Sequence, residues 1–176
     1  MKNEATLIII KNKHNGDTVI ENVLNYVLSS PFAELDEVMV NGISDNDYYQ
    51  MVQDFYSVQE PYTALKSHRR IFHMILSMRP CKNMQRNLDE GAEAFLEFMK
   101  IHGHQVLLVP HYGSKTNYAH YHWHAVVNVK SYLTGNTLLD KFGEFKLICD
   151  FMSQQSYIQW NYCYHNCDKI VPAEHF

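Results

Sequence analysis

Short apolar runs along the chain predict five strands. Residues 6–11 (TLIIIK) form a run that is typical of a buried strand, and residues 69–78 form a longer one. Residues 105–111 and 121–129 predict two more strands, which a loop of about nine residues joins as a long hairpin. Residues 157–164 predict a strand at the edge of the sheet.

Apolar residues at helical spacing predict four helices. The first helix follows Thr18, whose spacing from Glu21 fits a capping box. The second begins at residues 44–47 (SDND), and the third is capped by Asn87 and stops at Gly103. The inward stripes of the four helices are Val19, Ile20, Val23, Leu24 and Val27; Tyr48, Met51, Val52 and Phe55; Leu88, Ala92, Phe95, Leu96 and Met99; and Leu138, Phe142, Phe145, Ile148 and Met152.

The order of these elements indicates the fold class. Helices and strands interleave along the chain, but the two central strands join without a helix between them. This order favours an α+β fold, with a central antiparallel sheet and helices packed on its faces, over a doubly wound parallel sheet. The length of 176 residues, with no internal repeat or linker, predicts a single domain over residues 1–176.

The composition excludes several classes of protein. Apolar residues make up 46% of the chain and charged residues 19%, which excludes intrinsic disorder. No run of eighteen apolar residues predicts a membrane segment, and from the first four residues (MKNE) with the short apolar run 7–10 we expect no signal peptide. Four cysteines are too few for a secreted disulfide framework, so we expect a cytoplasmic protein. These are Cys81, Cys149, Cys163 and Cys167.

The net charge of −4 hides an uneven distribution of charge along the chain. Residues 1–60 hold ten acidic and three basic side chains, whereas residues 66–86 and 98–139 contain bases and no acid. Such a distribution is typical either of ordinary surface patchiness or of a face that binds a polyanion such as a nucleic acid. The basic residues that would make such contacts, and that would be the DNA-binding residues if the polyanion is DNA, are Lys66, Arg69, Arg70, Arg79, Lys82, Arg86 and Lys115.

A group of histidines predicts a metal site. His122 and His124 are two apart in a strand, so both project from one face of the sheet. His111 ends the preceding strand, one hairpin away, and can lie beside them. Three neutral imidazoles at one point can bind a metal and leave positions open for a substrate. Surface histidines in a polar hairpin are the alternative, and His120 shares the face and could compete as a ligand.

Two further groups of residues can be interpreted in more than one way. His73 lies in a central strand, where a hydrogen-bonded core histidine is favoured over a metal ligand. Cys163 and Cys167 flank His165 with the pattern of half a zinc site, but no second half accompanies them.

Taken together, these segments resemble the relaxase/mobilisation nuclease family of the HUH endonuclease superfamily. Members show an isolated histidine like His111, then a strand like residues 122–128 (HWHAVVN), then a Thr-Gly turn like the one in residues 132–135 (YLTG). Residues 71–78 (IFHMILSM) resemble a family strand of the pattern His-apolar-apolar-apolar-Ser, and residues 23–28 (VLNYVL) resemble the helix that carries the nucleophilic tyrosine. The similarity extends over about residues 6–155.

The resemblance implies an HUH-endonuclease-like fold and a specific activity. A relaxase nicks and rejoins single-stranded DNA at an origin of transfer, in the mobilisation or conjugation of a plasmid or other mobile element. Tyr26 would attack the scissile phosphodiester and form a 5′-phosphotyrosine. His111, His122 and His124 would bind the divalent ion, Mg²⁺ or Mn²⁺ in the first place, with Zn²⁺ as the alternative. Accessory mobilisation proteins are the further partners that the resemblance implies.

Several alternatives remain open at the level of sequence. Tyr48 and Tyr49, on the second helix, are alternative nucleophiles, because some replication initiators of the superfamily use tyrosines on a helix. A rolling-circle replication initiator or a single-strand transposase would use the same histidines. The family often has an acid two residues after its first histidine, and this chain has Gly113 there. That departure keeps open a catalytically silent DNA-binding module of the same fold.

Overall fold

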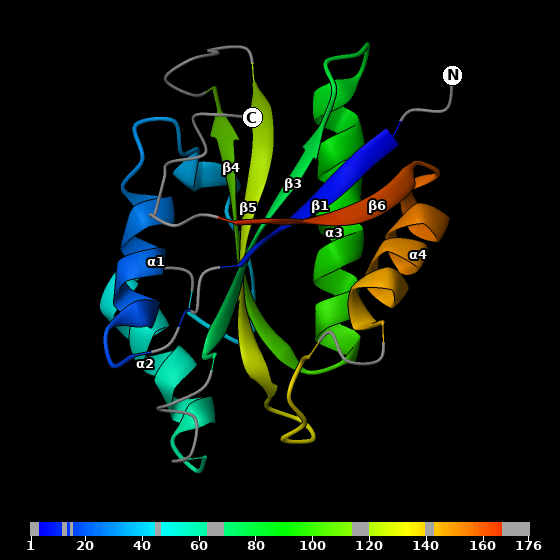
Figure 1. The fold of residues 1–176 in the computed structure, drawn as a ribbon. Coiled ribbons are helices and arrows are strands. Elements are labelled where there is room, and N and C mark those ends of the chain that lie inside the picture. The colour runs from blue at the N-terminus through cyan, green and yellow to red at the C-terminus, as the bar shows by residue number, and fades with distance from the viewer. Residues whose placement is uncertain are drawn as a thin grey trace.

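Six strands and four α-helices form in the part of the chain that the structure describes (Figure 1). The structure is a computed structural model, and it describes residues 4–11, 14, 16–44, 47–62, 69–113, 120–139 and 143–166. The strands are β1 (Glu4–Ile10), β2 (Met39–Asn41), β3 (Ile71–Met78), β4 (His104–Tyr112), β5 (Tyr121–Ser131) and β6 (Gln159–His165). The helices are α1 (Val19–Leu28), α2 (Tyr48–Gln59), α3 (Met84–Ile101) and α4 (Glu144–Ser156), and a 3-10 turn η1 spans Leu35–Glu37.

The six strands form one sheet in the order β2-β4-β5-β3-β1-β6. The pairs β2·β4, β4·β5, β5·β3 and β3·β1 are antiparallel, whereas β1 and β6 run parallel at one edge. The sequence-based prediction of an α+β fold with a central antiparallel sheet is therefore confirmed, and the parallel edge pair makes the whole sheet mixed. The predicted edge strand is β6, while the short strand β2 was not predicted.

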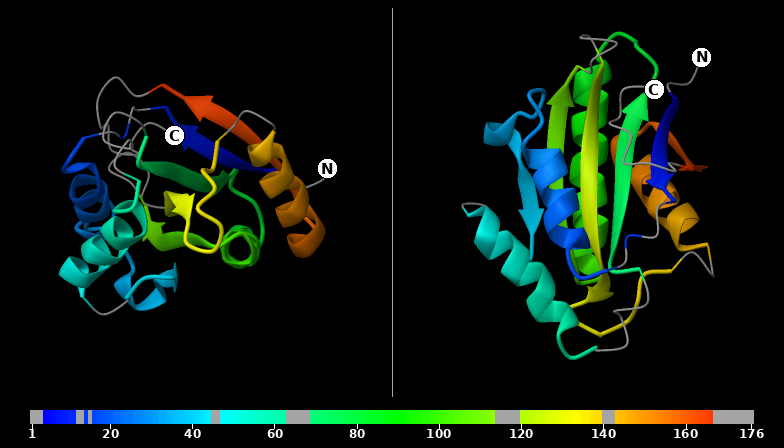
Figure 2. Two further views of the ribbon diagram at one scale, coloured as in Figure 1. Left: turned by 90° about the horizontal axis from the view of Figure 1, so that it is seen from below. Right: turned by 60° about the vertical axis from the view of Figure 1, so that its left-hand side comes forward.

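Two pairs of helices cover opposite faces of the sheet: α1 and α2 lie on one face, and α3 and α4 lie on the other (Figures 1 and 2). Each pair encloses its own apolar core. Val126 of β5 belongs to the core under α1 and α2, whereas Ala125 and Val127 belong to the core under α3 and α4. Because successive residues of a strand point to opposite faces, β5 is buried on both sides, which explains its almost continuous apolar sequence.

The face under α1 and α2 positions the candidate site. The even-numbered residues of β5 point to this face, so His122 and His124 lie on it together with Val126. Further along, the same face carries the apolar residues Leu107 and Ile71, on which the helices pack. The histidines therefore lie in the same layer as the core beneath the two helices.

Two predicted helix boundaries are wrong. Helix α3 begins at Met84 and not after Asn87, because Asn83 takes the left-handed conformation, with a φ of 67°, and starts the helix one turn earlier. Helix α4 begins at Glu144, so Leu138 precedes it, and the Leu138 amide instead donates to the Val129 carbonyl at 2.7 Å. Phe142, predicted in the same stripe, lies outside the described residues.

The predicted capping interactions have mixed outcomes. Thr18 precedes α1 as expected, but its hydroxyl caps no backbone amide, so the capping box does not form. The Glu21 carboxylate instead accepts a hydrogen bond from the Tyr56 hydroxyl of α2 at 2.5 Å. Asp47 does cap α2, since its side chain accepts hydrogen bonds from the amides of the second and third helical residues.

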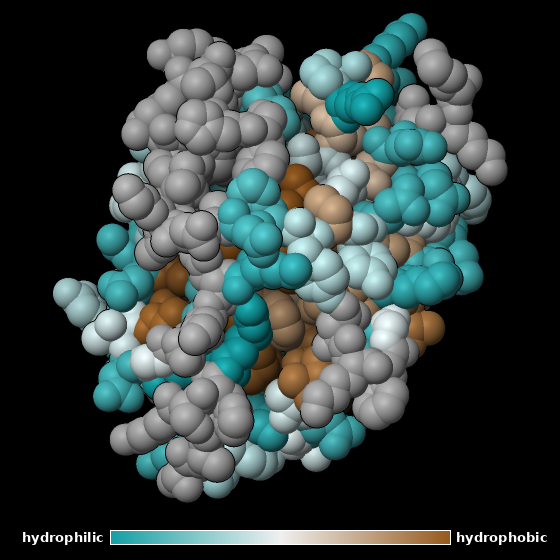
Figure 3. All heavy atoms as spheres, in the orientation of Figure 1, coloured by the Kyte–Doolittle hydropathy of each residue, from teal (hydrophilic) through white to brown (hydrophobic). Residues whose placement is uncertain are grey.

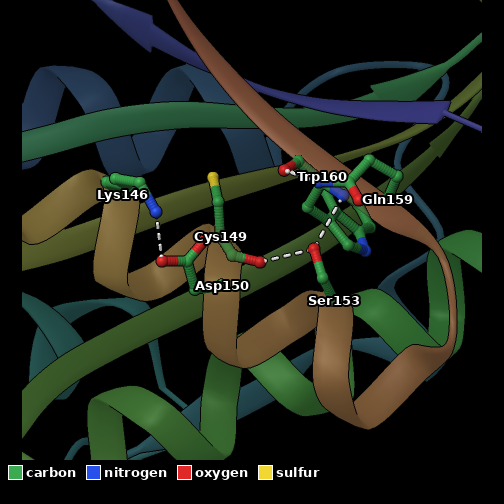
Figure 4. A network of polar contacts seen from close by, with 6 residues as sticks. All are labelled: Lys146, Cys149, Asp150, Ser153, Gln159 and Trp160. Atoms are coloured by element: carbon green, nitrogen blue, oxygen red, sulfur yellow. Dashed lines mark hydrogen bonds and ion pairs between the residues drawn. The ribbon is translucent and has the colours of Figure 1, made fainter.

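Helix α4 is attached to β6 by a network of polar contacts (Figure 4). The Ser153 hydroxyl accepts a hydrogen bond from the Trp160 amide at 2.8 Å and donates one to the Cys149 carbonyl at 2.7 Å. The indole of Trp160 is buried and lies against Gly91 of α3, where a Cβ would come within 2.1 Å of the ring. The glycine thus lets α3 approach the edge of the sheet closely.

In the view of Figure 3, hydrophilic side chains cover much of the β6 and α4 side, and hydrophobic side chains are visible on the α1 side and in the centre. Among the described helices, none is long and apolar enough to cross a membrane.

Candidate active site

The structure brings the three predicted histidines together. In the register of β4 and β5, His111 lies directly opposite His122, and His124 lies two residues further along the same face. All three are buried, with exposures of 4%, 1% and 1% for His111, His122 and His124. One ring nitrogen of each lies within 4.8 Å of the others. Within the described residues, this cluster holds three imidazoles and no carboxylate.

Each imidazole of this triad is oriented by a partner on its other nitrogen. His111 donates from Nε2 to the carbonyl oxygen of Val27 at 2.9 Å, which leaves its Nδ1 for a ligand. His124 Nδ1 is 2.8 Å from His73 Nε2, and His122 Nδ1 lies 3.4 Å from the carbonyl oxygen of His120. Partners of this kind fix the rotation and the tautomer of a metal-binding histidine.

The carbonyl of Val27 also connects the triad to α1. It belongs to the last turn of the helix, where carbonyl groups have no partner within the helix. By donating to this oxygen, His111 satisfies a helix terminus and joins it to the sheet. The position of the helix that carries Tyr26 is thus tied to the position of a triad imidazole.

Burial keeps the triad imidazoles neutral. Burial first, and then the nearby rings of His111 and His120, lower the pKa of His122 to about 3. The pKa of His124 is well below its usual value, chiefly because of burial and then because of His111. Burial also lowers the pKa of His111, against the hydrogen bond to Val27. At neutral pH all three rings are in the form that binds a metal ion.

The arrangement fits a divalent metal ion. Two nitrogens bound to one ion at about 2.1 Å each are roughly 3 to 3.5 Å apart. The Nε2 atoms of His122 and His124 are 3.1 Å apart, in accord with that spacing. Three nitrogen ligands on two neighbouring strands also leave further coordination positions for oxygen atoms. The buried triad can therefore bind a metal.

Tyr26 lies against the triad. Its ring contacts His124 edge to face, with centroids 6.0 Å apart, and contacts His73 in the same way at 5.9 Å. The apolar stripe of α1 holds this helix on the sheet, and Tyr26 is half-buried beside that stripe. Tyr48 and Tyr49, the alternative nucleophiles, contact each other on α2, and Tyr49 is 78% exposed.

Two more buried histidines surround His73 and the triad. His120 stacks on His122, with ring centroids 4.8 Å apart, and it is not a member of the metal-binding group. His14 contacts His73 edge to face at 6.2 Å, and its Nε2 is buried without a hydrogen-bond partner. Sequence analysis missed His14, because it lies between predicted elements. Its only signal was a histidine next to a turn-forming pair.

The structure describes five of the seven predicted DNA-binding residues. Arg70 is buried: its Nε donates to Gln59 Oε1 at 2.8 Å, and its guanidinium lies over the Tyr56 ring, so it contacts protein. Arg69 is partly buried, with its guanidinium 4.6 Å from the centre of the Phe72 ring. Arg79 and Lys82 are exposed between β3 and α3, and Arg86 is exposed in the first turn of α3, where it pairs with Glu90 at 2.9 Å. Lys66 and Lys115 lie outside the described residues.

The exposed basic segment lies at the histidine end of the sheet. Because β3 pairs Leu76 with Trp123, the chain leaves the sheet after Met78 near the end of β5 that carries His122. Arg79 and Lys82 follow directly, and both are exposed. These exposed cations therefore lie at the same end of the sheet as the triad.

Asn128, the last residue of the segment HWHAVVN, has a structural role that sequence analysis missed. Its amide nitrogen donates to the Phe55 carbonyl at 3.0 Å and to Gln105 Oε1 at 2.8 Å. Its amide oxygen accepts from Gln59 Nε2 at 2.7 Å. These bonds attach α2 to β4 and β5 below the histidines. The signal in the sequence was a fully polar residue inside an apolar strand, on the face of His122 and His124.

The structure describes two of the three residues of the possible half zinc site. Cys163 and His165 lie on the edge strand β6, and Cys163 is a free, exposed thiol. Cys167 lies outside the described residues.

The fold and the site define a class of protein: an α+β domain in which a tyrosine-bearing helix packs beside a buried histidine triad. The chain belongs to the relaxase family, since the family model described as the MobA/VirD2-like nuclease domain of relaxases matches residues 26–156, well over half of its length. The match begins at Tyr26 and includes the whole triad. It places the chain among the nucleases that nick DNA in mobilisation. Searches of curated proteins and of solved structures gave no match.

Proposed function

We propose that the chain is a metal-dependent relaxase that nicks and rejoins one DNA strand through a covalent bond to Tyr26. The observation that carries the proposal is the contact between the Tyr26 ring and His124, a member of the buried triad. It brings a hydroxyl-bearing side chain beside a site suited to a divalent ion, within one nuclease domain. The substrate would be single-stranded DNA at an origin of transfer, met in the cytoplasm, with accessory mobilisation proteins as further partners.

In this reaction Tyr26 is the nucleophile. The Oη atom of Tyr26 forms a bond to the scissile phosphorus, the bond from phosphorus to the 3′ oxygen breaks, and the strand is left with a 5′-phosphotyrosine. The proton of the phenol is lost, and the leaving 3′ oxygen gains one. Because a phosphodiester is replaced by a phosphodiester, attack by the 3′-hydroxyl can rejoin the strand.

The ion would be held by His111, His122 and His124. The phosphate oxygens of the substrate favour Mg²⁺ or Mn²⁺, whereas the three nitrogen ligands favour Zn²⁺. When bound, the ion supplies positive charge that neutralises the phosphate oxygens. Tyr26 needs such help, because a phenol with an ordinary pKa near 10 is a weak nucleophile at neutral pH. The exposed cations Arg79, Lys82 and Arg86 would bind phosphates along the strand.

The test is the detection of the covalent adduct. Labelled single strands that tile the DNA flanking the gene would be incubated with the protein and Mn²⁺, with Mg²⁺ and with EDTA, and resolved on denaturing gels. We expect a metal-dependent protein–DNA adduct that Tyr26→Phe abolishes while strand binding persists. Tyr49→Phe is the matched control, because Tyr49 is exposed on α2, and it should keep the adduct.

Two outcomes would contradict the proposal. An adduct that survives Tyr26→Phe and is lost in Tyr48→Phe or Tyr49→Phe would transfer the nucleophile to α2. Binding of single strands by the unmodified protein without any adduct, on every tile and with every ion, would indicate a catalytically silent DNA-binding module.

A further inference from the structure

We infer that His73 is a positioning residue of the triad: it accepts a hydrogen bond from Nδ1 of His124 and so keeps the Nε2 lone pair of His124 available to the metal ion. The inference rests on the proposed metal site. It assigns a role to the histidine of β3, which lies outside the metal-binding group itself.

The contact between the two imidazoles is close and buried. His73 Nε2 lies 2.8 Å from His124 Nδ1, and the two rings are nearly parallel, with centroids 5.1 Å apart and planes at 29°. In the β3·β5 register, Ile75 lies opposite His124, and His73 is two residues away on the same face. Both rings are more than nine-tenths buried, so water does not readily replace either partner.

Only one proton can lie between these two nitrogens, which gives two arrangements. If His73 donates, the neutral His124 ring carries its own proton on Nε2 and directs it toward His122 Nε2, 3.1 Å away. His124 then has no lone pair for an ion. If His124 donates from Nδ1, its Nε2 lone pair faces the triad, and His73 carries its proton on Nδ1. Metal binding therefore requires His73 to be the acceptor.

The chemistry of this partner differs from that of the partner of His111. A carbonyl such as that of Val27 has no proton to donate and can only accept, so it always favours one tautomer. An imidazole can accept or donate. His73 thus fixes His124 in the binding form only when its own proton is on the far nitrogen.

A pair of substitutions separates this role from packing. In His73→Gln the side-chain amide oxygen can still accept a hydrogen bond near the position of Nε2, whereas His73→Met fills similar space without a strong acceptor. Zn²⁺ affinity would be measured by competition with a chromogenic chelator, and Co²⁺ binding by its visible absorption. We expect Met to weaken Zn²⁺ binding about 10- to 100-fold, the usual loss when such a partner is removed. Gln should stay within a few fold of the unmodified protein.

Controls and a direct measurement make the outcomes distinct. Ile71→Val removes a buried methyl group from the same strand and should leave Zn²⁺ affinity unchanged. In the Zn²⁺-loaded protein, ¹⁵N NMR of the histidine rings should show a proton on Nδ1 of His124 and none on Nε2 of His73. The opposite protonation, an unchanged affinity in Met, or an equal loss in Met and Gln would each overturn the inference while the metal site stands. If the unmodified protein binds no Zn²⁺, Co²⁺ or Mn²⁺, the proposed function itself fails.

Discussion

At the scale of single residues, the neutral charge of the buried imidazoles decides both their chemistry and their cost. A histidine in an unfolded chain takes up a proton near pH 6.5. Burial lowers the pKa of His14 to about 4 and that of His73 to about 3, so the folded protein holds these rings neutral over a pH range in which the unfolded chain is protonated. The same neutrality leaves a lone pair on each ring for a metal or a hydrogen bond.

Stability should therefore fall as the pH is lowered below about 6.5, because the unfolded chain then binds protons that the native state does not. Each such histidine contributes about 1.4 kcal/mol per pH unit, until the pH reaches its folded pKa. Above pH 6.5 these groups add no pH dependence. Urea unfolding in EDTA at pH 7.5, 6.0 and 5.0 measures the slope, and His14→Gln should make it shallower. A free energy of unfolding that is constant over this range would contradict the assignment.

Removal of one triad ligand should abolish metal binding and spare the fold. In His124→Ala only two imidazoles remain, too few for a stable site, so Mn²⁺ binding measured by calorimetry and DNA cleavage should both be lost. His104→Ala is the control, because His104 is equally buried but donates to the Asn128 carbonyl outside the triad. Full metal-dependent cleavage by His124→Ala would show that the ligands have been assigned wrongly.

At the scale of secondary-structure elements, sequence patterns predicted what depends on local periodicity. His122 and His124 could be placed on one face because alternation in a strand is local, and His111 because a hairpin joins the two strands. The hydrogen bond between His73 and His124 could not be predicted. It depends on the register of β3 against β5, and these strands are far apart in the sequence, so no local sequence pattern determines that register. The start of α3 was missed because the residue before it, Asn83, takes the left-handed conformation and its side chain caps no amide. Such a helix start leaves no recognisable pattern in the sequence.

The attachment of α2 to the sheet depends on Asn128, which makes a prediction at this scale. Asn128→Ala removes the donor to Gln105 Oε1 and to the Phe55 carbonyl, and it removes one of the two acceptors of Gln59 Nε2, which still donates to the Arg70 carbonyl. The free energy of unfolding should fall by about 2 to 4 kcal/mol, since each unsatisfied buried group costs roughly 1 to 3 kcal/mol. Urea unfolding measures the loss, and the exposed Asn22→Ala serves as the control. Because Asn128 lies four residues beyond His124 in β5 and outside the triad, the Zn²⁺ affinity of the folded variant should stay unchanged.

At the scale of the whole molecule, a short basic segment stands apart from the acidic residues. Acidic residues lie on η1 and on all four helices or next to them, whereas Arg79 and Lys82 lie exposed in the acid-free segment after β3, at the end of the sheet that carries His122. Arg70, although counted with the basic block, is used inside the protein. A net charge of −4 is therefore compatible with a local site for a polyanion.

This distribution predicts how strand binding depends on salt. Each phosphate neutralised on single-stranded DNA contributes about 0.7 to the slope of log affinity against log salt concentration. Arg79→Gln and Lys82→Gln should each lower both the affinity and that slope by roughly one such contact. Fluorescence anisotropy with a labelled oligonucleotide, over a range of NaCl, measures both quantities.

The matched control for this prediction is Lys146→Gln. It removes one positive charge from α4, which lies on the face of the sheet opposite to the triad and to α1 and α2. Lys146 is exposed and already paired with Asp150, so its loss changes the net charge without touching the proposed track. If Lys146→Gln lowers the slope as much as Arg79→Gln, the DNA responds to the overall charge and not to a defined face. A smaller effect of Lys146→Gln locates the strand beyond β3, where its phosphates can continue to the triad and Tyr26.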